Sequence, residues 1–387
     1  MTTLISFLGK SQTGGYRKAR YCFDTGVVRE EPYFGMALKE HLNAQRLVLV
    51  GTAGSMWNAF FLDRGDGDDI EDLDRLDRAA AEGAVTAAML EGHAERLSAR
   101  LGIQVQCLLI GYAKSDDEQA DLLLRLAGVV SDGEHVVLDV THSFRHLPML
   151  ALVAARYLRR MRGVQVNDIY YGALDMTDAA TGETPVLRLK GMLTMLDWVD
   201  ALATYDKDGD YGVFAPLLHA DGMDRARADQ LAQAAFFERT SNAKRAFDEL
   251  SSVATSVEAH PGPLGRLFRA ELLRRIGWIR SKGRAAQEKD LASAYLQRQD
   301  FLRAAVFLQE SLKSAQLSAH GKDVDWRTSR DSAHESLRSQ SEYAELSDLR
   351  NAMAHGDQAA TEKAEDALNS RDKLKSAFRR IMSWSPR

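Results

Sequence analysis

Short apolar runs alternate with helical patterns in the first half of the sequence. Runs rich in β-branched residues predict strands at 3–8, 46–50, 103–110, 135–140 and 164–171. Helical spacing predicts helices at 34–42, 79–101, 117–130 and 148–161. Continuous apolar runs such as VVLDV indicate strands that are buried on both faces, as in parallel sheets covered by helices. We therefore expect an α/β fold with a Rossmann-like parallel sheet.

Two insertions interrupt this alternation. The segment 16–29 reads as a hairpin that turns at Asp24, Thr25 and Gly26. The acidic segment 64–78 fits no calcium-loop spacing, so we interpret it as a solvated loop.

Strand patterns end with a last β run at 185–190, and the remainder of the chain reads as helix. Expected helices cover 191–205, 225–257, 264–280, 289–319, 332–354 and 359–382. We place the domain change so that residues 1–195 form the α/β domain and 196–387 an all-helical domain. Residues 195–285 carry no motif, so sequence alone does not indicate how the two halves communicate.

Composition narrows the class of protein. Hydrophobic residues make up 45% and charged residues 27% of 387 positions, which is typical of a globular protein with real cores. No apolar run reaches the roughly 20 residues of a membrane span, so we expect a cytoplasmic protein with no membrane partner. Two cysteines exclude a disulfide framework, and the net charge of −5 means that a polyanion must bind to a local patch.

The segment LRNAMAHG at 349–356 has residue types that suit RNA cleavage without a metal. Such cleavage needs proton transfer to and from the ribose and the leaving oxygen, and a cation over the phosphorane. His355 titrates near neutral pH, and Arg350 stays charged and matches phosphate oxygens. Asn351 lies four residues before His355, on the same helix face, where its amide can orient the imidazole. No cluster with metal-ligand spacing surrounds residue 355, so we expect no metal.

Arg350 and His355 point about 140° apart around an ideal helix, so one copy does not readily complete a site. A two-fold axis through this helix would bring two segments together, which predicts a dimer. The alternative makes Arg350 an ion-pair partner of Glu345 or Asp348, and makes His355 a residue that closes a helix before a glycine.

The loop at 141–147 follows a buried strand and precedes Pro148, so it lies where open α/β sheets bind ligands. Its hydroxyls, imidazoles and guanidinium suit phosphate. They belong to Thr141, His142, Ser143, Arg145 and His146.

Two further loops are expected at the same edge of the sheet. The loop 51–57 offers Thr52, Ser55 and Trp57, and the loop after the first strand offers Lys10. None of the three loops has Walker spacing, which excludes a P-loop ATPase. The structural alternative is that Thr141 and Ser55 cap turns and that Trp57 packs in the core.

Two motifs carry a family resemblance that covers nearly the whole chain. The segment at 350–355 resembles the Arg-Asn-x3-His motif of HEPN ribonucleases, and the GT-x2-S-x-W and THSFRHLP loops resemble CARF domains of type III CRISPR ancillary proteins. The resemblance implies a homodimer or higher homo-oligomer that binds cyclic oligoadenylate, with four units suiting the family best. It also implies cleavage of single-stranded RNA to a 2′,3′-cyclic phosphate product, and no cofactor.

Two other functions remain open at this stage. The chain could be a non-enzymatic CARF-type regulator whose basic segment 266–284 binds nucleic acid or a protein partner. Alternatively, the sensor domain could also cleave its own ligand through Thr141 and His142. Sequence leaves the ring size, the RNA sequence preference and any assembly beyond a dimer undecided.

Overall fold

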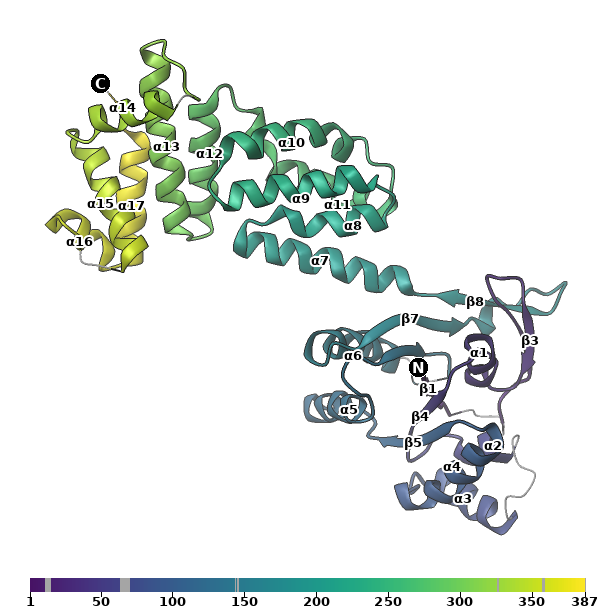
Figure 1. The fold of residues 1–387 in the computed structure, drawn as a ribbon. Helices are drawn as coiled ribbons and strands as arrows, with labels where there is room; N and C mark the ends of the chain where they lie inside the picture. Colours follow the sequence, from purple (N-terminus) through teal and green to yellow (C-terminus); the bar gives the residue numbers. More distant parts are fainter. Residues whose placement is uncertain are drawn as a thin grey trace. The chain divides into compact units, whose positions relative to one another are not determined.

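The computed structural model describes residues 1–10, 15–62, 70–142, 144, 146–325, 327–356 and 359–386. The chain folds into two compact units, Met1–Thr194 and Met195–Arg387. Figure 1 shows a sheet covered by helices in the first unit and stacked helices in the second.

The amino-terminal unit is built on one sheet with the strand order β3-β2-β8-β7-β6-β1-β4-β5. The strands are β1 (Thr2–Phe7), β2 (Ala19–Cys22), β3 (Val28–Glu31), β4 (Arg46–Thr52), β5 (Gln104–Ile110), β6 (His135–Asp139), β7 (Gln165–Gly172) and β8 (Glu183–Arg188). β1 lies between β4 and β6 and is parallel to both. The Rossmann-like parallel sheet is thus confirmed in its centre, whereas β8 is antiparallel to β7 and β3 is antiparallel to β2.

Helices cover both faces of this sheet. They are α1 (Phe34–Leu42), α2 (Trp57–Leu62), α3 (Ile70–Glu82), α4 (Ala87–Leu101), α5 (Asp116–Gly128), α6 (Leu147–Met161) and the short η1 (Leu174–Met176). Side chains of β1 alternate between the two cores: Leu4 packs with residues of α1 to α4, and Ile5 packs with residues of α5 and α6. This alternation is the period of two that a strand buried on both faces requires.

Two local expectations in this unit were wrong. Residues 70–78 of the expected acidic loop belong to α3, because Leu73 and Leu76 provide an apolar side that packs into the core. The expected helix 79–101 breaks between α3 and α4, where Gly83 adopts a positive φ of 68°. The hairpin expected at 16–29 is present as β2 and β3.

The described part of the carboxyl-terminal unit is helical and contains no strand, so the expected all-α half is confirmed. Its helices are α7 (Lys190–Asp208, which begins in the first unit), η2 (Tyr211–Phe214), α8 (Ala215–Ala220), α9 (Arg225–Arg239), α10 (Ala243–Glu258), α11 (Pro263–Arg275), η3 (Gly277–Arg280), α12 (Arg284–Gln297), α13 (Phe301–Ala319), α14 (Arg327–Leu337), α15 (Ser341–His355), α16 (Glu362–Leu368) and α17 (Arg371–Ser383).

The longest expected helices of this unit are each divided in two. The helix expected at 225–257 ends at Arg239, and Asn242 accepts a hydrogen bond from the backbone N–H of Arg245 to begin α10. The helix expected at 289–319 breaks in the same way, with Asp300 capping α13. Periodicity continues across such breaks because both halves bury apolar residues in one core.

Candidate functional site

The carboxyl ends of β1, β4 and β6 meet at one edge of the sheet, and three loops leave from them. The loop after β4 is tied to the end of β1, since Ser55 Oγ donates to the carbonyl of Leu8 at 3.1 Å. The backbone N–H of Met56 donates to the carbonyl of Gly9. The loop after β6 is joined to the same strand through Ser6, whose hydroxyl donates to Asp139 Oδ2. The expectation that the three loops share an edge is therefore confirmed.

The side chains of Thr52, Ser55 and Trp57 hold the loop after β4 together. Each is buried, and Ser55 Oγ accepts the N–H of Thr52 at 2.9 Å. Trp57 Nε1 donates to the carbonyl of Thr52 at 2.9 Å. Their hydrogen-bonding groups are thus used within the loop, as the structural alternative proposed. These three residues would therefore contribute to ligand binding by fixing the shape of the loop.

A buried polar network lies beneath the loop after β6. Asp139 is fully buried, and its Oδ1 accepts the N–H of Thr141 at 2.9 Å. The Ser6 hydroxyl bridges this carboxyl group to the Tyr33 hydroxyl, at 2.6 Å from the latter. Burial raises the pKa of Asp139 to about 6, although hydrogen bonds from Ser6 and Thr141 oppose that rise. Thr141 Oγ1 accepts the N–H of Gly172 at 2.8 Å and so ties the loop to the end of β7.

His142 is held as a neutral hydrogen-bond acceptor at the start of α1. Its Nε2 accepts the backbone N–H of Phe34 at 3.2 Å, an amide that no side chain of α1 caps. The imidazole also stacks on Tyr33 with ring centroids 5.2 Å apart, and it meets Tyr16 edge-on at 4.9 Å. Burial lowers the pKa of His142 to about 4. The imidazole is therefore neutral at physiological pH and serves to fix the loop.

This environment predicts a pH-dependent contribution to stability. Between pH 6.5 and about 4 the unfolded chain protonates His142 while the folded protein does not, so the contribution is complete above pH 6.5 and lost toward pH 4. We expect the free energy of unfolding to fall by about 2–3 kcal/mol more in the wild type than in His142→Gln between pH 7 and pH 4.

Urea unfolding followed by circular dichroism at pH 7, 5.5 and 4 measures this difference. The raised pKa of Asp139 has the opposite effect, since it increases the free energy of unfolding as the pH falls from about 6 to about 4. Both proteins contain Asp139, so its contribution cancels in the comparison. Parallel pH profiles for the two proteins would contradict the assignment of a neutral acceptor.

The remaining predicted ligand residues differ in how far the structure places them. Lys10 is exposed at the end of the segment that follows β1. Ser143 and Arg145 lie outside the described residues, so their predicted role stays a prediction. His146 is exposed, and its Nε2 lies 2.9 Å from the carbonyl oxygen of Tyr112. Lys114, over the Tyr112 ring at 4.9 Å, adds a cation that the sequence reading missed.

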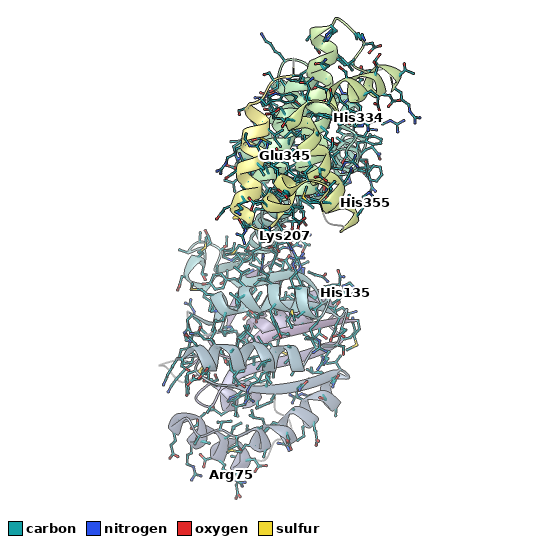
Figure 2. All side chains as sticks on the ribbon, turned by 90° about the vertical axis from the view of Figure 1, so that its left-hand side faces the viewer. Arg75, His135, Lys207, His334, Glu345 and His355 are labelled. Carbon is teal, nitrogen blue, oxygen red and sulfur yellow. The ribbon has the colours of Figure 1, made fainter. Side chains whose placement is uncertain are left out.

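The segment 350–355 forms the last turns of α15. Leu349 and Ala352 face the core, whereas Asn351 and His355 are exposed and Arg350 is half-buried. Gly356 ends the helix with a φ of 69°, and its N–H donates to the carbonyl of Ala352. His355 thus closes the helix as the alternative expected, and Figure 2 shows it at the edge of the helical unit. The position leaves its imidazole accessible.

The carboxylates proposed as structural partners of Arg350 are occupied elsewhere. Glu345 is buried and forms ion pairs with Lys363 at 2.7 Å and with Arg380 at 2.5 Å. Asp348 accepts hydrogen bonds from the backbone and side chain of Thr361. Within the described residues Arg350 forms no salt bridge. The ion-pair alternative therefore fails for both partners, and the guanidinium remains available to a phosphate.

A second imidazole near this helix was missed from the sequence. His334 of α14 lies with its Nδ1 2.7 Å from the hydroxyl of Tyr343, and the positive charge of Arg350 acts on that hydroxyl. Tyr343 and Arg350 are seven residues apart and so share one side of α15. No motif links His334 to the segment 350–355, and only its contact with Tyr343 of α15 reveals it.

The basic segment 266–284, the candidate recognition helix of a regulator, is neutralised in part, at three of its seven cationic side chains. Arg274 and Arg275 pair with Glu271, and Arg275 also binds Asp206 at 2.6 Å. Arg284 pairs with Glu288 at 2.8 Å. These arginines are therefore less suited to a nucleic-acid backbone than their density in the sequence suggests.

No group of three or more histidine, cysteine, aspartate or glutamate side chains among the described residues is placed to hold a metal ion. No described helix is long and apolar enough to cross a membrane.

Comparisons with known proteins agree with the architecture of the amino-terminal unit. Residues 3–175 match the family model described as the CARF domain of the CRISPR system endoribonuclease Csx1. The chain is also 25% identical over 256 residues to the CRISPR-associated protein MJ1674 of Methanocaldococcus jannaschii. That alignment covers 60% of this chain and 40% of the relative, so the chain spans less than half the length of this curated protein.

Proposed function

We propose that this chain, whose residues 3–175 match the CARF domain of a CRISPR endoribonuclease family, is a type III CRISPR ancillary RNA endonuclease that cyclic oligoadenylate switches on. The amino-terminal unit would bind the activator, and the carboxyl-terminal unit would act as a HEPN-type ribonuclease on single-stranded RNA. The cell compartment proposed is the cytoplasm, where such a substrate is found.

One observation carries the nuclease half of the proposal: α15 presents Arg350 and His355 without the ion pairs that would give Arg350 a structural role. Under this proposal Arg350 holds the scissile phosphate and stabilises the phosphorane charge. His355 transfers the proton between ribose, solvent and leaving oxygen, and Asn351 orients it. The products are a 2′,3′-cyclic phosphate and a free 5′-hydroxyl, and the proposed step requires no metal.

The sensor half of the proposal rests on the edge formed by β1, β4 and β6. The loops there are fixed by buried contacts of Ser55, Asp139 and His142, which supports a preorganised binding surface. The proposed phosphate contacts are Lys10, which is exposed, and Ser143 and Arg145, which lie outside the described residues. Thr141 holds the loop after β6 in place by accepting the N–H of Gly172. Cyclic tetra-adenylate is the activator that we propose first, bound by a homodimer.

A direct assay tests the proposal. Labelled single-stranded RNA is incubated with the full-length protein and EDTA, with no nucleotide or with cyclic tetra-adenylate, cyclic hexa-adenylate, AMP or ATP. We expect one cyclic ring to raise the initial cleavage rate by about 5–150-fold, the usual range of allosteric coupling. The linear nucleotides should leave the rate unchanged.

The nature of the product adds a second readout, because a 2′,3′-cyclic phosphate resists removal by a simple phosphomonoesterase and opens in acid. Equal cleavage rates with and without every ring would contradict gating. Loss of cleavage in EDTA, restored by one divalent ion, would contradict the metal-independent mechanism.

A further inference from the structure

A cavity of about 490 Å³ lies within the carboxyl-terminal unit, in the stretch of the chain where the sequence shows no motif. Residues of α7, α9, α11, η3 and α12 line it, so it is formed inside one compact unit. Its size falls within the roughly 300–1,000 Å³ of small-molecule sites. It does not include Arg350 or His355, and it is separate from the loops of the amino-terminal unit.

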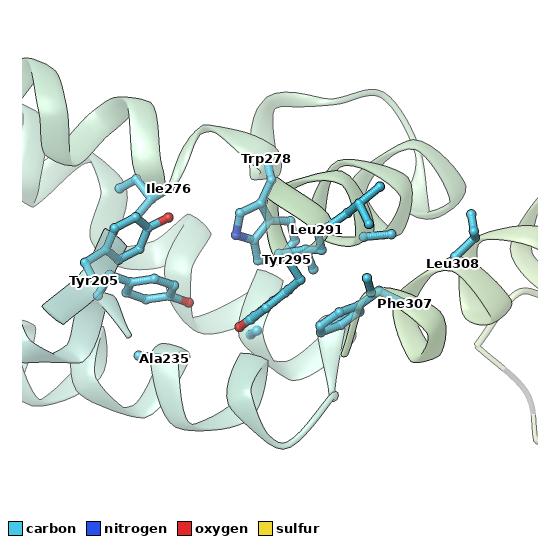
Figure 3. Packing of buried hydrophobic residues seen from close by; sticks show 14 of the residues in the cluster. Tyr205, Ala235, Ile276, Trp278, Leu291, Tyr295, Phe307 and Leu308 are labelled. Carbon is cyan, nitrogen blue, oxygen red and sulfur yellow. The ribbon is translucent and has the colours of Figure 1, made fainter. Parts of the chain in front are cut away.

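A buried carboxylate provides the inner wall of this cavity. Glu238 is only 4% exposed, and its Oε1 accepts the hydroxyl of Tyr295 at 3.0 Å. Its Oε2 has no hydrogen-bond partner among the described residues, nor has Nε1 of Trp278. In Figure 3 the indole nitrogen of Trp278 and the hydroxyl of Tyr295 both point into the space between Trp278, Tyr205 and Tyr295. Burial raises the pKa of Glu238 to about 7, although the nearby donors of Tyr295, Trp278 and Tyr211 and the positive charge of Arg298 oppose that rise.

Arginine side chains and Tyr205 form another part of the lining. The guanidinium of Arg298 lies over the Tyr205 ring at 4.4 Å and near the Tyr295 ring at 5.7 Å. Arg275 also lies over Tyr205, but it is paired with Asp206 and Glu271. Arg298 forms no salt bridge within the described part of the chain. Its stacked position fixes the cation near Glu238, whose carboxylate its positive charge stabilises.

These features specify a ligand with three properties. A buried carboxylate oxygen without a partner calls for an N–H donor, because an unpaired buried acceptor is costly. Aromatic walls call for a flat ring system, and an unpaired arginine calls for an anion. A purine nucleoside monophosphate combines all three. A sugar phosphate lacks both the ring system and the N–H donor.

We propose that this cavity is a second nucleotide site, in which a purine monophosphate places an N–H on Glu238 Oε2 and its phosphate on Arg298. Trp278 and Tyr205 contact the base. The site is distinct from the activator surface of the amino-terminal unit and from the ribonuclease segment, and it takes a mononucleotide.

Isothermal titration of the full-length protein tests this with GMP, AMP, UMP and ribose 5-phosphate. We expect at least one purine monophosphate to bind, and ribose 5-phosphate to bind at least about tenfold more weakly, since it lacks the charge-assisted hydrogen bond to the carboxylate. Glu238→Gln and Arg298→Ala should each weaken purine binding by about tenfold. The matched control is Arg225→Ala, since Arg225 lies on the same helix as Glu238, is 74% exposed on its side chain and lies outside the cavity.

The variants separate this site from the amino-terminal unit, which could also bind a nucleotide. Purine binding that is unchanged in both Glu238→Gln and Arg298→Ala would place the ligand elsewhere and overturn the proposal. Absence of binding by every probe at millimolar concentration would overturn it too. Circular dichroism confirms that each variant is folded, and Glu238→Gln conserves the shape of the buried side chain, so the test does not depend on a disruptive change.

Discussion

His355→Ala is expected to lower the activator-stimulated rate of RNA cleavage by about 10²–10⁴-fold, because a positioned general acid or base contributes that much. His355 is exposed at the end of α15, so removal of its imidazole should cost little stability. Arg350→Ala should cause a comparable loss, since it removes the cation proposed to stabilise the phosphorane. Initial rates with labelled RNA at saturating cyclic tetra-adenylate measure both effects.

Matched substitutions in the same unit serve as controls. His320→Ala removes another exposed histidine, at the end of α13, and Arg338→Ala removes an exposed arginine that pairs with Glu335 at 3.1 Å. Both should cleave RNA at the wild-type rate. Titration with cyclic tetra-adenylate should give the wild-type affinity for His355→Ala, because activator and substrate bind to different units. A fully active His355→Ala protein, shown free of contaminating nuclease, would end the ribonuclease proposal and leave the regulator function.

The sheet could be anticipated from the sequence, and so could the edge at which its loops meet. A mostly apolar run such as 136–140 indicates a strand buried on both faces, and β6 proved to be central. Parallel strands place their carboxyl ends together, so the proximity of the loops after β1, β4 and β6 follows from topology. The antiparallel pairing of β8 with β7 could not be anticipated, since it depends on a turn that lets the chain return along its neighbour.

The roles of individual site residues required contacts between distant parts of the chain. His142 was interpreted as a ligand contact, but its imidazole accepts the N–H of Phe34, which is 108 positions away. Trp57, by contrast, is buried and bonded within its own loop, as the structural alternative expected. No spacing rule predicts the pairing of His142 with Phe34, because it arises from the packing of α1 against the sheet. The cavity around Glu238 was invisible for the same reason: its walls come from five separate elements.

The geometry of α15 predicts a second large effect: a mixture of two inactive variants should recover part of the RNA cleavage rate. Arg350 and His355 are five residues apart and point about 140° away from each other, so one helix does not easily present both to one phosphate. If a dimer pairs Arg350 of one subunit with His355 of the other, a heterodimer of Arg350→Ala and His355→Ala retains one such pair. An equal mixture that exchanges subunits freely should regain about a quarter of the wild-type rate, because half of the dimers are mixed and each keeps one of two pairs.

The control for this complementation replaces the His355→Ala partner with the double variant Arg350→Ala, His355→Ala, mixed with Arg350→Ala. No dimer in that mixture carries Arg350, so its rate should stay at the background of the single variants. Subunit exchange is verified with two differently tagged chains recovered as one complex before the rates are measured. Verified exchange without recovery would contradict the pairing of Arg350 and His355 across the dimer and would mean that each subunit supplies its own arginine and histidine to one phosphate.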